Sequence, residues 1–286
     1  MQRPAVLVIA ATDSSGGAGL TRDVRVLTDF AVDALCVVTA VTAQSDKKVS
    51  AVHHVPPEVI RAQIAATFAT RRIDAIKIGM LGTQATVEAV VEELTAAGAS
   101  LPNEIPIVVD PVLVATSGGV LLESGGRAAL TGSLFRMATL VTPNVPEAAA
   151  LLGELAAANE AELIQQGARL LGLGSRAILL KGGHAFTGAE EGQDAIDLLI
   201  WRGATEGRSA DTLSGDTRAA SNGHPNDLSI ERIGSKRVAG SSRGTGCALA
   251  SGIAAGLAAG KPLSEACRAA KRYVLGMLAR VRPAVS

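Results

Sequence analysis

The stretch Arg243-Gly244-Thr245-Gly246-Cys247 runs directly into a segment of small residues, Ala248 to Ala259. Two glycines around a threonine, where an irregular region becomes a helix, can turn successive backbone N–H groups toward one point. The helix N-terminus adds partial positive charge there, so Gly244, Thr245 and Gly246 form a candidate anion hole. Cys247 would lie in the first helical turn, where the same N–H groups favour its thiolate and make it a candidate base or nucleophile. The alternative is a glycine-rich helix start that merely buries a cysteine.

The composition is that of a globular protein. The 286 residues suffice for one large α/β domain or two small ones, and 48% hydrophobic against 19% charged residues excludes disorder of the whole chain. Basic and acidic side chains each number 27, and only 2% of the residues are aromatic. Without a dense basic run or stacking platforms, we expect no nucleic-acid partner.

Cysteines and apolar segments indicate a cytoplasmic protein. Cys36, Cys247 and Cys267 are odd in number and lie in no metal-binding spacing, which is typical of reduced thiols. The apolar N-terminus runs at once into Asp13 and a glycine cluster, as a first strand does and a signal peptide does not. The small-residue segment is shorter than the roughly twenty residues that span a bilayer. We therefore expect no membrane contact, and expect this helix to pack closely against a sheet.

Short runs of valine, isoleucine and leucine alternate with segments of helical period, which predicts a parallel sheet covered by helices. The predicted strands are Val6–Ala10, Cys36–Val41, Ala75–Ile78, Ile107–Val109, Leu140–Val141, Ala177–Leu180 and Ile196–Trp201. The predicted helices are Leu20–Phe30, Glu58–Thr70, Thr83–Ala97, Arg127–Leu134, Pro146–Leu152, Ala161–Leu171, Thr245–Ala259 and Ser264–Val281. Right-handed crossovers bring the carboxyl ends of such strands to one edge, where ligands bind.

Polar or glycine-rich turns follow six of these strands. They are Asp13 to Gly19, Thr42 with Gln44, Gly79 with Met80, Asp110 with Pro111, Thr142 to Asn144, and Lys181 to His184. We expect them to share one edge of the sheet. One segment breaks the alternation: from Arg202 to about Ser242 the chain is polar and poor in apolar residues, which predicts a flap or a partly disordered insertion at about residues 203–240.

Asn144, Glu147 and Asp110 are candidate magnesium ligands, because Mg²⁺ prefers oxygen ligands and keeps several waters. Asn144 and Glu147 stand where a strand gives way to a helix, so a capping arrangement at the helix start is the alternative. For Asp110 the alternative is a turn residue before Pro111.

Lys181 and two polar side chains are candidates for ligand contacts. Lys181 ends a very apolar strand and could reach a polyphosphate, or it could simply extend into water. Asp23 and Gln44 could hydrogen-bond a planar heterocycle that carries an amino group; the alternatives are a helix-surface charge and a turn residue. The common dinucleotide and P-loop glycine motifs are absent.

Seven short motifs in this order resemble the hydroxymethylpyrimidine/phosphomethylpyrimidine kinases of thiamine biosynthesis, in the ribokinase-like superfamily. The resemblance covers Ala5 to about Trp201 and resumes at Arg243. The motifs are Thr12 to Gly19 with Asp23, Thr39 to Gln44, Lys77 to Leu81, Asp110 to Val112, Thr142 to Ala148, Lys181 to His184, and Gly244 to Cys247.

The resemblance implies one ribokinase-like domain over residues 1–286, with a mostly parallel sheet between two helix layers. It implies transfer of the ATP γ-phosphoryl group to the hydroxymethyl group of a pyrimidine and to its monophosphate, with Mg²⁺ as cofactor and a homodimer as assembly. The implied roles are pyrimidine contacts for Asp23, Gln44 and Met80, magnesium ordering for Asn144, Glu147 and Asp110, ATP contacts for Lys181 and Thr142, the anion hole for Gly244, Thr245 and Gly246, and the base for Cys247.

The chain departs from the family pattern at several positions. Ser241-Ser242-Arg243 stands where the family has Asn-Thr-His, Thr116 where it tends to have lysine, and Ala248 where it has threonine. Two other functions stay open: a pyridoxal or pyridoxine kinase of the same superfamily, and a non-catalytic sensor that binds the pyrimidine phosphate.

Overall fold

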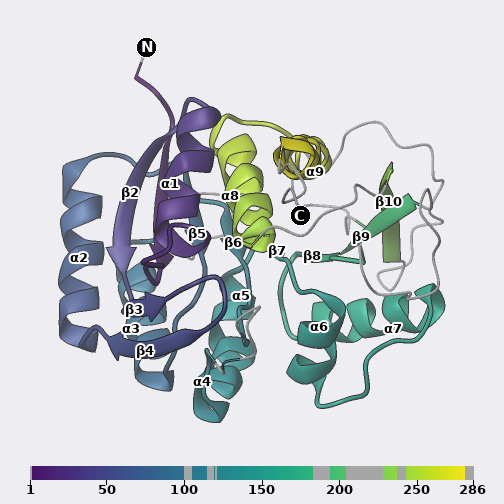
Figure 1. Ribbon diagram of the computed structural model, residues 1–286, viewed down its shortest axis with the longest axis horizontal. Helices are drawn as coiled ribbons and strands as arrows, with labels where there is room; N and C mark the ends of the chain where they lie inside the picture. The colour runs from purple at the N-terminus through teal and green to yellow at the C-terminus, as the bar shows by residue number, and fades with distance from the viewer. Residues whose placement is uncertain are drawn as a thin grey trace.

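The computed structural model describes residues 2–99, 105–114, 119, 121–182, 194–203, 228–236 and 243–280. Their main sheet has eight strands in the order β10-β9-β8-β7-β6-β5-β1-β2 (Figure 1). The strands are β1 (Ala5–Ala10), β2 (Asp33–Val38), β5 (Ala75–Ile78), β6 (Ile107–Val109), β7 (Leu140–Val141), β8 (Ala177–Leu180), β9 (Asp194–Arg202) and β10 (Leu228–Lys236). From β2 to β8 all neighbours pair in parallel, whereas β9 and β10 are antiparallel, so the predicted mostly parallel sheet is confirmed.

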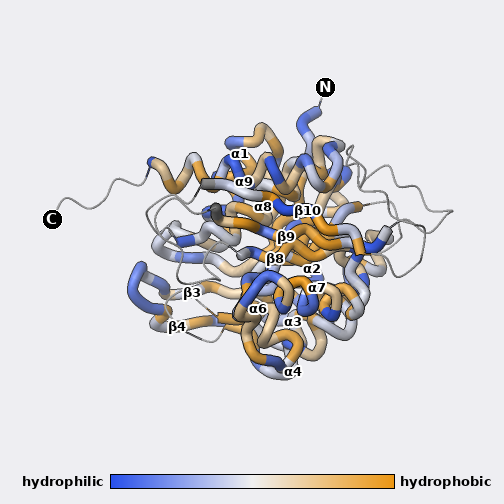
Figure 2. Tube along the Cα trace, turned by 90° about the vertical axis from the view of Figure 1, so that its right-hand side faces the viewer, coloured by the Kyte–Doolittle hydropathy of each residue, from blue (hydrophilic) through white to orange (hydrophobic). Residues whose placement is uncertain are grey.

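Helices cover both faces of the sheet, as Figure 2 shows edge-on. They are α1 (Gly19–Asp29), α2 (Pro57–Thr70), α3 (Gln84–Ala96), α4 (Ser124–Ala129), α5 (Phe135–Met137), α6 (Val145–Leu152), α7 (Glu160–Leu171), α8 (Thr245–Ala258) and α9 (Leu263–Arg280). Alternate residues of β1 face opposite layers: Val6 and Val8 pack with residues of α1, α8 and α9, whereas Leu7 and Ile9 pack with the other layer. The three-layer ribokinase-like fold is therefore confirmed.

Four central strands lie where the sequence predicts them. Strands β5, β6, β7 and β8 have the predicted bounds, and every residue in them is buried. A parallel strand that is covered on both faces reads as a continuous apolar run, which is why these four are recognisable. Their carboxyl ends, with that of β1, lie at one edge of the sheet.

The predicted strand Cys36–Val41 corresponds to β2, but its bounds are wrong, because β2 runs from Asp33 to Val38 and the chain leaves the sheet at Thr39. Thr39 is fully buried, and its hydroxyl donates to the Met80 carbonyl at 2.6 Å. The next residues form β3 (Ala40–Gln44), which pairs with β4 (Val49–His54) in a separate antiparallel hairpin. Thr42 and Gln44 thus belong to this hairpin and not to a turn of the main sheet.

Part of the predicted insertion is also ordered. Residues Leu228–Lys236 pair with β9 along its whole length, so this part of the predicted flap or partly disordered insertion is a strand, and most of the remainder lies outside the described residues. Ile233 is buried on one face while Ile230 packs on the other, which is the alternation of a strand. The helix predicted at Arg127–Leu134 begins at Ser124 as α4 and passes into a π-helical segment at Leu130–Leu134.

Two glycines in the middle of α8, Gly252 and Gly256, face another helix. A Cβ atom on Gly252 would lie 3.0 Å from the Ala270 Cβ, and one on Gly256 would lie 2.8 Å from the Ala266 Cβ, both on α9. Larger residues of α8, such as Ile253, pack in the cluster that contains the sheet residues Val6 and Val8. The expectation that this helix packs against the sheet is confirmed, and Gly252 and Gly256 serve in addition its contact with α9. Among the described helices none is long and apolar enough to cross a membrane.

We predict that Gly252→Leu lowers the free energy of unfolding by about 1–3 kcal/mol, the usual cost of overpacking. The leucine would collide with Ala270 and with the Phe30 ring, 3.4 Å from the position of its Cβ. Gly276→Leu on α9 is the matched control, because nothing lies within 4 Å of a Cβ there. Urea unfolding of both variants tests the prediction, and equal midpoints for the two would contradict it.

Candidate active site

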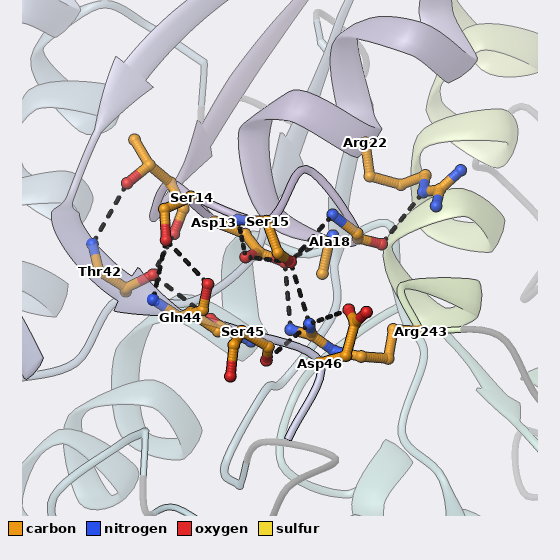
Figure 3. A network of polar contacts seen from close by, with 12 residues as sticks. Asp13, Ser14, Ser15, Ala18, Arg22, Thr42, Gln44, Ser45, Asp46 and Arg243 are labelled. Atoms are coloured by element: carbon orange, nitrogen blue, oxygen red, sulfur yellow. Dashed lines mark hydrogen bonds and ion pairs between the residues drawn. The ribbon is translucent and has the colours of Figure 1, made fainter. Parts of the chain in front are cut away.

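The loop between β1 and α1 is wound around the carboxylate of Asp13 (Figure 3). One oxygen accepts from the Ser15 amide at 2.9 Å and the other from the Ala18 amide at 2.8 Å. Gly19 follows with φ of 55°, and a Cβ on it would lie 2.5 Å from the Ala11 carbonyl oxygen. Only glycine allows this return toward β1, so Asp13 and Gly19 together fix the path of the loop.

The start of α8 lies directly on this loop. Gly244 is the N-cap residue with φ of 74°, and a Cβ there would lie 2.2 Å from the Gly17 carbonyl oxygen. No side chain caps the first turn of α8, so its N–H groups point toward the carboxyl edge of the sheet without a capping partner. The Gly19 backbone lies close enough to the Cys247 thiol to lower its pKa. The predicted anion hole, Gly244 to Gly246, therefore adjoins both the glycine loop and the thiol.

A fully buried ion pair joins three elements near the thiol. Lys77 Nζ of β5 lies 2.8 Å from Asp23 Oδ2 of α1, and both side chains are 0% exposed. Ser251, one turn after Cys247 on α8, donates to the other Asp23 oxygen at 2.8 Å. Both carboxylate oxygens of Asp23 are thus engaged inside the protein. Its contact with a pyrimidine stays a prediction.

Burial raises the pKa of the Cys247 thiol to about 11. The positive charge of Lys77 and the Gly19 amide lower the pKa, while Asp23 and Asp110 raise it. The expectation that the helix start makes the thiolate the favoured form is therefore wrong, because desolvation outweighs the N–H groups. At neutral pH the group is a thiol.

A second contact between a lysine and carboxylates lies next to Gly246 at the start of α8. Lys181 Nζ is 2.9 Å from Asp110 Oδ1 and 3.6 Å from Glu147 Oε2. Thr142 Oγ1 lies 3.3 Å from the same Asp110 oxygen. A Cβ on Gly246 would lie 3.3 Å from both Asp110 Oδ2 and Lys181 Nζ. The predicted ATP and metal residues and the predicted anion hole therefore meet at one place.

Asn144 and Glu147 form a capping box at the start of α6. The Glu147 amide donates to Asn144 Oδ1 at 2.8 Å, and the Asn144 amide donates to Glu147 Oε2 at 2.8 Å. The capping alternative is thus realised, and burial raises the pKa of the Glu147 carboxyl while Lys181 lowers it.

Asp110 and Glu147 both face the Lys181 ammonium, and two carboxylates around one cation also suit Mg²⁺. No group of three or more acidic, histidine or cysteine side chains that could hold a metal occurs within the part of the chain that the structure describes. The magnesium roles of Asp110, Asn144 and Glu147 stay predictions.

The β3–β4 hairpin brings Gln44 to the same edge. The Gln44 amide donates to Ser14 Oγ at 2.8 Å, and the same hydroxyl lies 2.8 Å from the Gln44 carbonyl oxygen. Next to it, the Ser45 carbonyl accepts from Arg243 Nη1 at 2.9 Å, so Gln44 lies on the same side of the molecule as Cys247. Met80 is mostly buried and packs with Ala11, Ala40 and Leu121.

The sequence alone gave no role to Asp13, Lys77 or Arg243. A lysine inside the apolar run Ala75–Ile78 was the available signal for Lys77, since a charge in a strand buried on both faces needs a partner. No local signal pairs Asp13 with Arg243, which lie 230 positions apart. His184, Thr116, Ser241 and Ser242 lie outside the described residues.

We predict that Cys247 alkylation by iodoacetamide accelerates steadily between about pH 7 and 10, because the thiolate is the nucleophile and the thiol pKa is about 11. The experiment uses a Cys36→Ser background, in which the other cysteine, Cys267, is buried. Replacing the ion pair by Lys77→Met with Asp23→Leu should slow the reaction at every pH, since Lys77 lowers the thiol pKa more than Asp23 raises it. A plateau near neutral pH would contradict the raised pKa.

Comparisons with known proteins agree on one family. The phosphomethylpyrimidine kinase family model matches residues 13–284. A hydroxymethylpyrimidine/phosphomethylpyrimidine kinase of Rhizobium meliloti is 38% identical over 94% of this chain and 88% of its own length. The solved phosphomethylpyrimidine kinase of Clostridium difficile superposes with a TM-score of 0.74 at 29% identity, over 96% of this chain and 99% of that one.

A pyridoxal kinase of Staphylococcus aureus, solved with AMP-PCP and pyridoxal, superposes with a TM-score of 0.77 at 25% identity, over 97% of this chain and 88% of that one. It shares the fold, but its sequence identity is lower than the 38% of the relative from Rhizobium meliloti, and the family model matches nearly the whole sequence. The chain belongs to the phosphomethylpyrimidine kinase family.

Proposed function

We propose that the protein transfers the γ-phosphoryl group of ATP to the hydroxymethyl group of 4-amino-5-hydroxymethyl-2-methylpyrimidine and to its monophosphate in thiamine biosynthesis. The observation that carries the proposal is the uncapped start of α8, which holds Cys247 between the Lys77–Asp23 and Asp110–Lys181 pairs. The relatives are named for this pyrimidine and its phosphate. Catalysis of phosphoryl transfer depends mainly on positioning and charge neutralisation, which this arrangement supplies.

Each group has a definite task in this reaction. The amides of the predicted anion hole, Gly244, Thr245 and Gly246, stabilise the charge on the transferring phosphoryl oxygens, as the N-terminus of a helix does for phosphates. Lys181 neutralises a phosphate of ATP. Cys247 accepts the proton of the substrate hydroxyl in its thiolate form, which is the minor form at neutral pH because burial raises the thiol pKa. Proton transfer accompanies formation of the new O–P bond, while the bond from the γ-phosphorus to the departing ADP breaks.

ATP is the phosphoryl donor in this proposal, in line with the AMP-PCP complex of the Staphylococcus aureus kinase. Asp110 and Glu147, which both face Lys181, would hold Mg²⁺, with Asn144 beside them. When bound, Mg²⁺ would neutralise charge on the phosphates. Gln44 of the β3–β4 hairpin and Met80, which follows β5, would contact the pyrimidine.

A pyridoxal kinase is the second candidate, favoured by the structural similarity to the kinase that was solved with pyridoxal. Comparing kcat/KM for the pyrimidine alcohol and for pyridoxal decides between them. The homodimer and the cytoplasmic location remain predictions, and sedimentation analysis of the purified protein tests the first.

We predict ADP and phosphorylated pyrimidine when the purified protein meets ATP, Mg²⁺ and the pyrimidine alcohol. The monophosphate as substrate tests the second phosphorylation separately. If the pyrimidine binds by calorimetry while no ADP appears at any Mg²⁺ concentration, the sensor hypothesis replaces the kinase.

We predict that Cys247→Ala lowers kcat by about a hundredfold or more, the usual effect of losing a general base. The KM for the pyrimidine should stay close to that of the unchanged protein, because Gln44 and Met80 are intact. Cys36→Ala is the matched control, since that cysteine is exposed on the edge strand β2. Full turnover by the Cys247 variant would assign the base to another group.

A further inference from the structure

The Arg243 guanidinium contacts four groups of the β1–α1 loop and the β3–β4 turn (Figure 3). Nη2 lies 3.1 Å from Asp13 Oδ2. Nη1 lies 3.0 Å from Ser15 Oγ, 2.9 Å from the Ser45 carbonyl oxygen and 3.0 Å from Asp46 Oδ1. The Arg243 side chain is 15% exposed, and the contact with the buried Asp13 is the one made largely out of water, whereas Ser15, Ser45 and Asp46 are exposed.

The contacts join three segments that are distant in sequence. Asp13 and Ser15 belong to the β1–α1 loop, Ser45 and Asp46 to the β3–β4 turn, and Arg243 directly precedes the N-cap of α8. The hairpin forms a sheet of its own, without strand pairing to the main sheet. Near its turn it is held by Ser14, which hydrogen-bonds the Gln44 backbone, and by Arg243.

The charges around Arg243 indicate that its guanidinium holds protein segments together and does not bind a ligand. Two carboxylates already neutralise the guanidinium, and that of Asp13 is 2% exposed. Asp46 is 85% exposed, so its ion pair contributes little, as exposed pairs generally do. Of the Arg243 contacts, the one with the Ser45 carbonyl acts on the position of the turn, together with the Ser14 contacts, because a backbone group next to Gln44 cannot move independently of it.

We propose that Arg243 is a positioning residue that fixes the β3–β4 turn, and with it Gln44, against the start of α8. It sets the spacing between the pyrimidine side and the phosphate side of the site. The kinetic part of this inference rests on the proposed kinase function, whereas the structural part does not.

Tryptic cleavage provides a readout that is independent of activity. Lys47 and Lys48 are exposed in the β3–β4 turn, so trypsin reports how often the turn detaches. Arg243→Gln should accelerate cleavage after these lysines by about tenfold, the scale expected for loss of a charge-assisted hydrogen bond. The matched control is Arg169→Gln on α7, which removes the ion pair of Arg169 with Glu154 and should leave the cleavage rate unchanged.

Arg243→Lys guards against a variant that fails to fold. The lysine keeps a positive charge beside Asp13, but its single nitrogen cannot reproduce contacts that Arg243 divides between two nitrogens. Cleavage should therefore accelerate in this variant while the urea midpoint stays near that of the unchanged protein. Cleavage at the original rate in both Arg243 variants would overturn the proposal.

Kinetics then test the positioning role. In both variants the KM for the pyrimidine should rise by about tenfold while the KM for ATP changes less than about twofold, because only the Gln44 side loosens. A rise in the KM for ATP alone would make Arg243 a phosphate ligand and overturn the proposal. If the unchanged protein does not phosphorylate the pyrimidine, the kinase function fails, and the cleavage rates still decide whether Arg243 holds the turn.

Discussion

The buried ion pair between Lys77 and Asp23 is the constraint on which the site depends. It joins β5 to α1 and, through Ser251, to α8, so the three elements around the thiol share one pair of fully buried charges. Removing two charges from water costs several kcal/mol per ion, and close contact only offsets this cost, so such a pair is a poor source of stability. Its value is electrostatic, because Lys77 is the strongest influence that opposes the effect of burial on the Cys247 thiol.

The two lysines near the start of α8 differ in their freedom to act. Lys77 is 0% exposed and held by a carboxylate that is equally buried, so its charge is fixed. Lys181 is 17% exposed and shares Asp110 and Glu147 within 4 Å, so an incoming phosphate can replace either carboxylate as its partner. Because each lysine is balanced by acid, we infer under the proposed function that the initial attraction for an anion comes from the backbone N–H groups of α8. In that proposal, charge neutralisation by Lys181 follows once the phosphates are in place.

The sequence predicted what local patterns encode. Strands buried on both faces are continuous apolar runs, so β5 to β8 could be placed residue by residue, and the polar turns after them marked the site. The break at Thr39 could not be read, because it depends on a hydrogen bond to Met80 across the fold. The strand β10 is recognisable only beside β9, which supplies its partners. The thiol pKa depends on burial by distant segments, which no motif specifies.

The Asp13 carboxylate joins the glycine loop after β1 to the start of α8. It accepts from Ser15 and Ala18 within the glycine loop and from Arg243 at the start of α8. A buried carboxylate that loses a donor bears the full cost of its desolvation, so these contacts persist together or break together. The close approach of Gly244 to the Gly17 carbonyl adds a steric limit to the same junction. The β3–β4 turn, held by Arg243, is therefore coupled through the Asp13 carboxylate to the glycine loop and to the start of α8.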